Sequence, residues 1–228
     1  MNRTLAPEWL DALPSANSHA VGSRRDLRRL NSFMRHPALV SAALRNSFPN
    51  RPPAGIAELG AGDGSFLLKT ASLLASSFPS FPSMKCVLVD RRPSVSDATR
   101  RAFDRLGCRV EVIEADVFDW LQSSQADAAV ANLFLHHFTD SELRRLFFLL
   151  STKCNALVAC EPRRALFPFV VSHLLGGIGC NAVTRHDAPI SVRAGFRSSE
   201  LTALWPDSAW RLRENGAGLF SHLFVARR

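Results

Sequence analysis

The sequence predicts an α/β fold in which helices cover both faces of a largely parallel sheet. Five apolar runs of strand length alternate with segments whose apolar residues recur at helical spacing. The runs lie at residues 56–59, 84–90, 108–114, 126–133 and 155–160. Such alternation requires crossover connections and therefore parallel strands. Three glycines directly after the first run, Gly60, Gly62 and Gly64, indicate a tight turn that a ligand can approach closely.

Residues 1–50 come before this alternation and carry two predicted helices. Apolar residues recur at helical spacing among arginines after Ser23, which we expect to be the N-cap of the first helix. The second helix is expected from residue 37 to residue 48, and three prolines then break the chain. We therefore expect an N-terminal helical segment at residues 1–50 and one larger domain at residues 51–228.

The elements after the glycine turn follow in a regular order. The turn leads into a predicted helix over residues 66–78, which Pro79 and Pro82 would end. The second apolar run is followed by a predicted helix over residues 94–106, with Gly107 at its C-terminal cap. The third run precedes another short helix.

The second half of the chain repeats this pattern and then departs from it. Thr139 and Glu142 form the pattern of a capping box for the helix after the fourth run. Near the C-terminus, two segments with strand-like alternation flank Asn215-Gly216, which predicts a hairpin. The sheet should therefore end in an antiparallel pair.

Composition limits the class of protein. The 228 residues are 46% hydrophobic, which is enough for one domain with a full core. The formal net charge of +8 permits a polyanionic partner. The arginines are scattered as pairs, however, and this favours ordinary solvated faces.

The cysteines and the N-terminus indicate a reducing, cytoplasmic setting. None of the five cysteines forms a Cys-x-x-Cys pair, so we expect neither a disulfide framework nor a zinc site. The N-terminus lacks an apolar signal core. The apolar stretch at residues 165–183 contains Pro168 and a glycine cluster, and we expect a buried or pocket-lining helix there instead of a membrane span.

The charges around the glycine turn indicate the ligand. The glycines follow the spacing G-x-G-x-G, in contrast to the G-x-G-x-x-G of dinucleotide sites. Glu58 before the turn and Asp63 within it would repel a pyrophosphate but suit an ammonium and a sulfonium. Asp90 closes the second run, where an acid can accept hydrogen bonds from ribose hydroxyls. S-adenosyl-L-methionine carries all three groups.

Residues 58–64 together with Asp90 closely resemble the class I S-adenosylmethionine-dependent methyltransferases. The resemblance implies a Rossmann-like, doubly wound, seven-stranded sheet that is mostly parallel with an antiparallel C-terminal strand, covered by an N-terminal helical lid. S-adenosyl-L-homocysteine would be the product. The implied cofactor-binding residues are Glu58, Gly60, Ala61, Gly62, Asp63, Asp90, Arg91, Asp116, Val117, Asn132 and Leu133. Asp116 would bind the adenine amino group, and it could equally cap the next helix.

The candidate catalytic residues, His136 and His137, come just after the fourth run. The segment that contains them resembles the ubiquinone- and menaquinone-type small-molecule methyltransferases. A hydroxyl acceptor needs a base, and imidazole titrates in the useful range. We expect His137 to contact the acceptor and His136 to be structural, although both could merely shape the site. No carboxylate set for a divalent ion is evident, so we expect a metal-independent reaction.

The acceptor is expected to be a small aromatic or phenolic molecule. Residues 23–31 and 191–196 resemble a bacterial subgroup found with type III polyketide synthases, which implies a polyketide-like acceptor and secondary metabolism. His186 and Asp187 lie in the segment expected to form its pocket, and the aromatic residues expected near it are Phe134, Phe138, Phe167, Phe169, Phe196 and Trp205.

Two other functions remain open. A nucleic-acid methyltransferase is the main rival, but no proline-aromatic motif follows Asn132 and the chain has no tyrosine. A non-catalytic cofactor-binding protein is the other. Oxygen and carbon methylation are both compatible with the sequence, as are a monomer and a homodimer.

Overall fold

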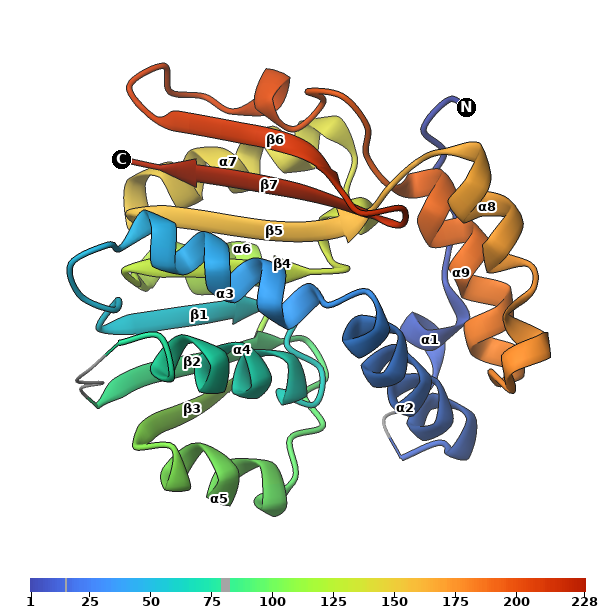
Figure 1. The fold of residues 1–228 in the computed structure, drawn as a ribbon, viewed down its shortest axis with the longest axis horizontal. Coiled ribbons are helices and arrows are strands. Elements are labelled where there is room, and N and C mark those ends of the chain that lie inside the picture. Colours follow the sequence, from blue (N-terminus) through green and yellow to red (C-terminus); the bar gives the residue numbers. More distant parts are fainter. Residues whose placement is uncertain (15, 79–82) are drawn as a thin grey trace.

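The computed structural model of the protein describes residues 1–14, 16–78 and 83–228. Within these residues, seven strands form one sheet in the order β3-β2-β1-β4-β5-β7-β6 (Figure 1). The strands are β1 (Gly55–Leu59), β2 (Met84–Asp90), β3 (Cys108–Glu114), β4 (Ala128–Asn132), β5 (Ala156–Pro162), β6 (Arg211–Ala217) and β7 (Ser221–Arg227). Strands β1 to β5 pair in parallel, and β7 runs antiparallel to both β5 and β6. This order and direction confirm the predicted Rossmann-like fold.

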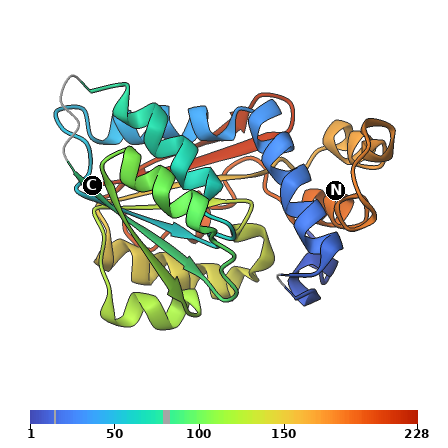
Figure 2. The same cartoon turned by 90° about the horizontal axis from the view of Figure 1, so that it is seen from below.

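Helices occupy both faces of this sheet. They are α1 (Trp9–Ala12), α2 (Ser18–Phe33), α3 (His36–Ser47), α4 (Ser65–Ala75), α5 (Asp97–Arg105), α6 (Val117–Ser123), α7 (Asp140–Lys153), α8 (Leu166–Ser172) and α9 (Ala182–Ala194), with short 3-10 turns η1 (Leu135–His137), η2 (Leu175–Ile178) and η3 (Thr202–Leu204). Helices α3, α4 and α5 pack on one face and α6 and α7 on the other (Figure 2). Each face carries its own hydrophobic cluster, so β4 and β5 are apolar on both sides.

The N-terminal helices divide between two places. Helices α1 and α2 lie beyond the carboxyl ends of the parallel strands, beside α8 and α9 (Figure 1). Helix α3 packs on the sheet itself, against α4 and β5. The contact between α2 and α9 is anchored by buried Asp26, which accepts hydrogen bonds from the Asn181 N–H at 2.8 Å and the Thr184 hydroxyl at 3.2 Å.

The beginning of α2 differs from the prediction. The helix begins at Ser18, and the side chain of Asn17 caps it by accepting a hydrogen bond from the His19 N–H. The predicted N-cap, Ser23, lies inside the helix, where its buried hydroxyl accepts a hydrogen bond from Thr184. The correction has a physical reason, because a serine hydroxyl can bond across a helix interface as well as cap a helix.

The C-terminal hairpin is present, but its turn lies elsewhere. Asn215 and Gly216 are paired inside β6, and the chain reverses after them with Gly218 at φ +71°. Pairing of the two strands up to Ala217 and Ser221 therefore overrides the local turn signal.

Two other predicted helices are also changed. The apolar stretch 165–183 is split into α8, η2 and the start of α9. Among the described residues, no helix is long and apolar enough to cross a membrane.

Helix α4 ends at Ala75, and the predicted terminators Pro79 and Pro82 lie outside the described residues. The capping box of Thr139 and Glu142 is confirmed at the start of α7.

Candidate active site

The turn between β1 and α4 requires its glycines. Gly60, Gly62 and Gly64 have φ values of +72°, +55° and +71°, which side chains rarely allow. Gly60 is further restricted, because a Cβ atom there would lie 2.3 Å from the ring of Phe134. The backbone N–H groups of Gly60 and Ala61 donate to the Val89 carbonyl and tie the turn to β2.

Asp90 lies at the end of β2 and holds this turn in place. Its Oδ2 accepts a hydrogen bond from the Gly62 N–H at 2.8 Å, and its Oδ1 accepts one from the Arg92 N–H at 2.7 Å. Each carboxylate oxygen can accept more than one hydrogen bond. The partly exposed carboxylate therefore keeps acceptor capacity for a pair of ribose hydroxyls, while Arg91 is exposed beside it.

Asp63 links the glycine turn to the N-terminal helices. Its Oδ1 accepts a hydrogen bond from the Ser65 N–H, and its Oδ2 lies 2.5 Å from an Nη atom of Arg28 on α2. Sequence analysis did not find this partner, because nothing in the spacing along the chain pairs α2 with the turn. Asp63 therefore joins the segment before residue 50 to the predicted cofactor loop.

Glu58 occupies a different position from the other acids. It is buried beneath the turn, and its Oε2 has no hydrogen-bond partner within the described part of the chain. Burial, then the charges of Asp63 and Asp90, raise the pKa of Glu58 well above its usual value. Glu58 therefore lies beneath the turn in a site that disfavours its charge, and a direct cofactor contact by it stays a prediction.

Asp116 caps helix α6, as one of its two predicted roles requires. Its Oδ1 accepts a hydrogen bond from the Phe118 N–H at 2.8 Å, and Val117 between them is buried. Because β3 is parallel to β2, Asp116 and Asp90 follow the same edge of the sheet. Binding of adenine by Asp116 and Val117 stays a prediction.

Asn132 ends β4 and contacts the N-terminal helices. Its Nδ2 donates to Asn31, and its Oδ1 accepts a hydrogen bond from His36 Nδ1 at 2.8 Å. Burial lowers the pKa of His36 to about 4, so this histidine is neutral at pH 7. Its Nε2 is then the acceptor for the Ser221 hydroxyl at 2.6 Å.

The backbone changes direction directly after Asn132. Leu133 has φ +52°, an uncommon value for a residue with a side chain, and its N–H donates to the Cys160 carbonyl. Such strain persists only where the surrounding structure enforces it. Here it turns Phe134 toward Gly60 and begins the short turn that carries the two histidines.

His136 is held as a buried cation. Glu161 on β5 accepts hydrogen bonds from the N–H groups of Phe134 and Leu135 and from His136 Nδ1 at 2.8 Å. Burial opposes the charge of His136, but its hydrogen bond to Glu161 and the nearby carboxylate of Glu8 outweigh that cost and raise its pKa to about 9. His136 is therefore protonated at pH 7 and cannot accept a further proton.

His137, the neighbour of His136, has the opposite protonation state. Its side chain is 28% exposed, and its Nδ1 lies 3.4 Å from a carboxylate oxygen of Asp11. The pKa of His137 is lowered, first by burial and then by the positive charge of His136, whose ring centroid is 4.2 Å away. His137 is thus a neutral imidazole beside an imidazolium.

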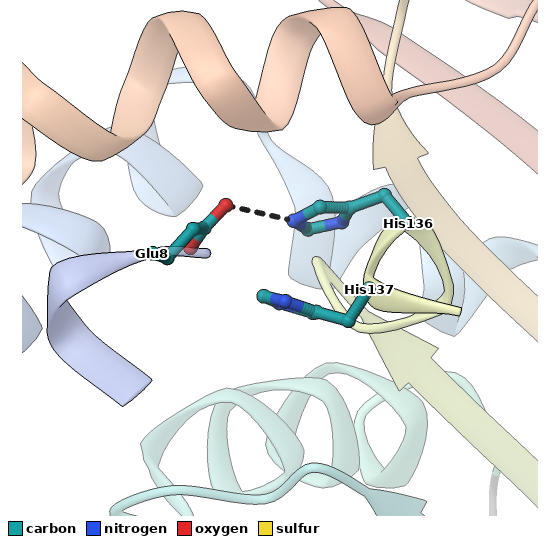
Figure 3. Close-up of side chains that lie close together, drawn as sticks. All are labelled: Glu8, His136 and His137. Atoms are coloured by element: carbon teal, nitrogen blue, oxygen red, sulfur yellow. Dashed lines mark ion pairs between the residues drawn. The ribbon is translucent and has the colours of Figure 1, made fainter. Parts of the chain in front are cut away.

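Glu8, next to α1, completes this group (Figure 3). It lies 3.4 Å from His136 Nε2 and accepts a hydrogen bond from the Ser191 hydroxyl at 2.5 Å. One ligand atom from each of Glu8, His136 and His137 lies within 4.8 Å of the others, so these residues could hold a divalent ion. Metal independence therefore stays a prediction.

Sequence analysis missed Glu8, because the N-terminal segment lacks periodicity and only the tertiary fold brings it to β4. Asp187 anchors the N-terminal segment, because it accepts hydrogen bonds from the backbone N–H groups of Trp9 and Leu10. The ring of His186 stacks on Trp9 at 3.7 Å. His186 and Asp187 thus hold the N-terminal segment next to the histidine pair.

The aromatic residues expected around the acceptor divide into three groups. Phe134 and Phe138 are in edge-to-face contact beside the glycine turn. Phe196 and Trp205 are buried in the hydrophobic core. On α8, Phe167 is exposed, and Phe169 contacts the ring of His173 and the guanidinium of Arg193. Only Phe134 and Phe138 therefore lie next to both the turn and the histidines.

Comparisons with known proteins agree with this arrangement. Residues 56–152 match the family model of a methyltransferase domain. No protein of curated function matches the chain in sequence. Many solved structures share its fold.

Three of these structures illustrate the likeness. An O-methyltransferase family protein from Burkholderia thailandensis is 18% identical with a TM-score of 0.58, over 88% of this chain and 56% of its own. The mitomycin 7-O-methyltransferase MmcR is 21% identical with a TM-score of 0.55, over 93% of this chain and 61% of its own. The plantazolicin methyltransferase BpumL, in complex with a triazolic desmethylPZN analog and SAH, is 12% identical with a TM-score of 0.63, over 96% and 93%.

The protein thus spans little more than half the length of the first two proteins. At these identities, the structures establish the fold. The match to the methyltransferase domain model covers the glycine turn, Asp90, Asp116 and the histidine pair. The chain therefore contains a methyltransferase domain and has the fold of the class I methyltransferases, whose cofactor is S-adenosyl-L-methionine.

Proposed function

We propose that the protein transfers a methyl group from S-adenosyl-L-methionine to a hydroxyl group of a small aromatic or phenolic acceptor. The observation that carries this proposal is the divided histidine pair at the end of β4. A neutral, partly exposed His137 stands beside a protonated His136 that Glu161 and Glu8 hold in place. The pair begins two residues after Phe134, whose ring packs on the glycine turn.

The residues of the turn fit the cofactor. Asp90 has acceptor capacity for the ribose, and Asp63 supplies a carboxylate for the ammonium group. The bound cofactor supplies an electrophilic methyl group on sulfur. The protein then contributes alignment and removal of the acceptor proton.

In the proposed reaction the acceptor hydroxyl gains the methyl group and gives up its proton to the protein. With the cofactor held at the glycine turn, the acceptor oxygen would receive the methyl group as it loses its own hydroxyl proton. The hydroxyl proton passes to a ring nitrogen of His137, which is neutral and can accept it. His136 keeps its own proton and its bond to Glu161, so it orients the turn as a positioning residue.

We also propose that α1 and α2 form a lid. They lie over the carboxyl edge of the sheet, and three contacts support this role: Arg28 to Asp63, Asn31 to Asn132 and Glu8 to His136. We propose residues 1–50 as the N-terminal helical segment and residues 51–228 as the methyltransferase domain. Within that segment α1 and α2 form the lid, whereas α3 packs on the sheet.

The acceptor class rests on Phe134 and Phe138, with support from natural-product methyltransferases of the same fold. A phenolic polyketide of bacterial secondary metabolism is our specific proposal, with methylation of carbon as an alternative. We propose a cytoplasmic location, which is supported by five cysteines that are free and buried.

A screen of phenolic acceptors with methyl-labelled cofactor tests the acceptor class. We expect label in a phenolic product, and mass spectrometry with NMR should place it on oxygen. Label on a ring carbon would select the alternative. Label in RNA, with binding that weakens steeply as salt rises, would contradict the small-molecule proposal.

Calorimetry with S-adenosylhomocysteine tests the cofactor site. Asp90→Ala should abolish measurable binding, because it removes both the ribose acceptor and the bond to the Gly62 N–H. Asp104→Ala on α5 is the matched control, since Asp104 is exposed and should leave binding unchanged. Equal affinity in the two variants would remove Asp90 from the site.

Chelation tests the proposed metal independence. Turnover after treatment with EDTA should equal turnover before it, because His137 acts as the base without an ion. Loss of activity that Zn²⁺ restores would instead assign Glu8, His136 and His137 to a metal centre.

A further inference from the structure

Helix α8 and the turn after it expose a row of large apolar side chains. Leu166, Val170, Leu174 and Ile178 recur at every fourth residue, and Phe167 adjoins them. Each of these side chains is between 51% and 70% exposed. A concentration of this kind usually marks an interaction surface.

The row continues onto neighbouring elements through aromatic contacts. The ring of Phe167 lies 5.6 Å from that of Phe220 in the turn between β6 and β7, and Phe220 lies 6.4 Å from Phe33 at the end of α2. Phe33 is itself 75% exposed. The apolar patch comprises Phe33, Leu166, Phe167, Val170, Leu174, Ile178 and Leu219.

The exposed charges on the two segments that carry most of the apolar patch, residues 16–57 and 163–199, are positive. Arg35 follows α2, Arg185 lies against Gly176 of η2, and the guanidinium of Arg193 lies 4.9 Å from the centre of the Phe169 ring. The segments 16–57 and 163–199 contain two acidic residues, Asp26 and Asp187. Both side chains are buried and accept hydrogen bonds, so neither offsets the positive charge of the arginines at the surface.

We propose that the apolar patch docks the protein onto a membrane surface that contains anionic lipid. Aliphatic and phenylalanine side chains favour the boundary between head groups and acyl chains, and the arginines meet the lipid phosphates. An arginine close to such a surface strengthens partitioning by about five-fold. Because α2, α8 and α9 lie beyond the carboxyl ends of the strands, docking would bring the active-site end of the molecule to the bilayer (Figure 1).

The same charges argue against two other occupants. A symmetric dimer through the apolar patch would place arginines of one copy near those of the other, with no exposed carboxylate on these segments to separate them. A nucleic acid would meet the arginines, but the aliphatic centre offers its phosphates no donors. A bilayer satisfies both the apolar centre and the basic rim.

Co-sedimentation with vesicles tests the proposal. The protein should sediment with vesicles of phosphatidylcholine and phosphatidylserine, more weakly with phosphatidylcholine alone, and less as salt rises. The double variant Phe167→Ser/Leu174→Ser should lose about ten-fold or more of the partitioning. Phe148→Ser on α7 is the control, because Phe148 is similarly exposed but α7 packs on a face of the sheet, away from the end that carries α8 (Figure 1).

A second pair of measurements makes the test decisive. Arg35→Gln/Arg185→Gln should reduce binding to the anionic vesicles and leave binding to neutral ones unchanged. In a Phe167→Trp variant, the new tryptophan's emission should shift to the blue when vesicles are added. Calorimetry with S-adenosylhomocysteine should give wild-type affinity for every patch variant, so failure to dock is distinguishable from failure of the methyltransferase proposal.

Three outcomes would overturn the proposal. The first is a wild-type protein that stays in solution with anionic vesicles. The second is a Phe167→Ser/Leu174→Ser variant that binds them as well as Phe148→Ser does. The third is a wild-type dimer in sedimentation velocity that this double variant converts to a monomer, which would assign the apolar patch to a second copy of the chain.

Discussion

Two adjacent histidines of identical chemistry have opposite protonation states in this protein. His136 is enclosed between Glu161 and Glu8, which keeps it charged up to a pH of about 9. His137 is only partly exposed, and its pKa is lowered by burial and by the charge of His136. The difference in pKa comes from the surrounding residues. As a result His136 keeps its proton and orients the turn, whereas His137 can accept a proton.

The residue-scale prediction concerns this division. His137→Asn should bind S-adenosylhomocysteine as tightly as the wild type, because it leaves the glycine turn and Asp90 intact. Its turnover should fall about 100-fold or more, since removal of a general base typically costs that much. Calorimetry and a steady-state assay with the identified acceptor separate the two effects.

His19→Asn is the control for this variant, because His19 is exposed on α2 and should have no effect on turnover. His136→Gln should instead reduce both turnover and stability, because it leaves Glu161 buried without its partner. Full turnover in His137→Asn would remove the base assignment.

At the scale of elements, the turn between β1 and α4 constrains its glycines in two ways, through backbone conformation and through side-chain packing. All three have positive φ, but Gly60 also receives the ring of Phe134. The position of Phe134 depends on Leu133, whose positive φ is enforced by the end of β4. The cofactor turn and the histidine turn are therefore packed into one unit.

Gly60→Ala and Gly62→Ala form a matched pair that tests this packing. Each should cost about 1 kcal/mol for its positive φ. Gly60→Ala should destabilise the protein further and weaken S-adenosylhomocysteine binding, because its Cβ would lie 2.3 Å from Phe134, whereas Gly62 faces open space. Adding Phe134→Ala should recover part of the Gly60→Ala loss, as measured by thermal unfolding. Equal effects of the two alanines would show that the ring does not constrain the turn.

The lid contact between α2 and the glycine turn makes a separate prediction. Arg28→Gln should change the free energy of unfolding by less than about 1 kcal/mol, because the pair with Asp63 is partly exposed. Dissociation of S-adenosylhomocysteine should nevertheless become faster, since α2 loses its link to the turn. Stopped-flow displacement measures that rate.

Arg29→Gln, on the same helix, is the control, because Arg29 is directed toward Asp26 and not toward the turn. If Arg28→Gln and Arg29→Gln release the ligand at the wild-type rate, the proposed lid role of α2 is contradicted.

At the scale of the whole molecule, two buried histidines make stability depend on pH in opposite directions. The pKa of His36 falls from 6.5 to about 4 on folding, and that of His136 rises from 6.5 to about 9. Below pH 6.5 the unfolded chain takes up a proton that folded His36 refuses. Above pH 6.5 folded His136 keeps a proton that the unfolded chain has lost.

The combined contribution of these two histidines to the free energy of unfolding should therefore be greatest near pH 6.5 and fall on both sides. Each histidine contributes up to about 3 kcal/mol of this change, the acid part lost down to pH 4 and the alkaline part lost up to pH 9. Urea unfolding across this range measures it. His36→Gln should flatten the acid side and His136→Gln the alkaline side; unchanged slopes in both would contradict the assignments.

The sequence by itself determined the sheet, the glycine turn and the edge on which the functional residues lie. Apolar runs at strand length and glycines at positive φ are local properties, so β2 and β3 begin and end at the predicted residues. Asp90 and Asn132 follow as strand ends, because parallel strands place their carboxyl ends together. The capping roles of Thr139 and Asp116 were equally local.

Only the tertiary structure decided which residues meet at that edge. Glu8, Arg28 and His36 come from the N-terminal segment, and no periodicity along the chain pairs them with His136, Asp63 or Asn132. The division of roles between His136 and His137 and the exposed face of α8 also depend on burial, which is a property of the packed molecule. Local patterns fix what each segment becomes, and long-range packing fixes the protonation and the partners of its side chains.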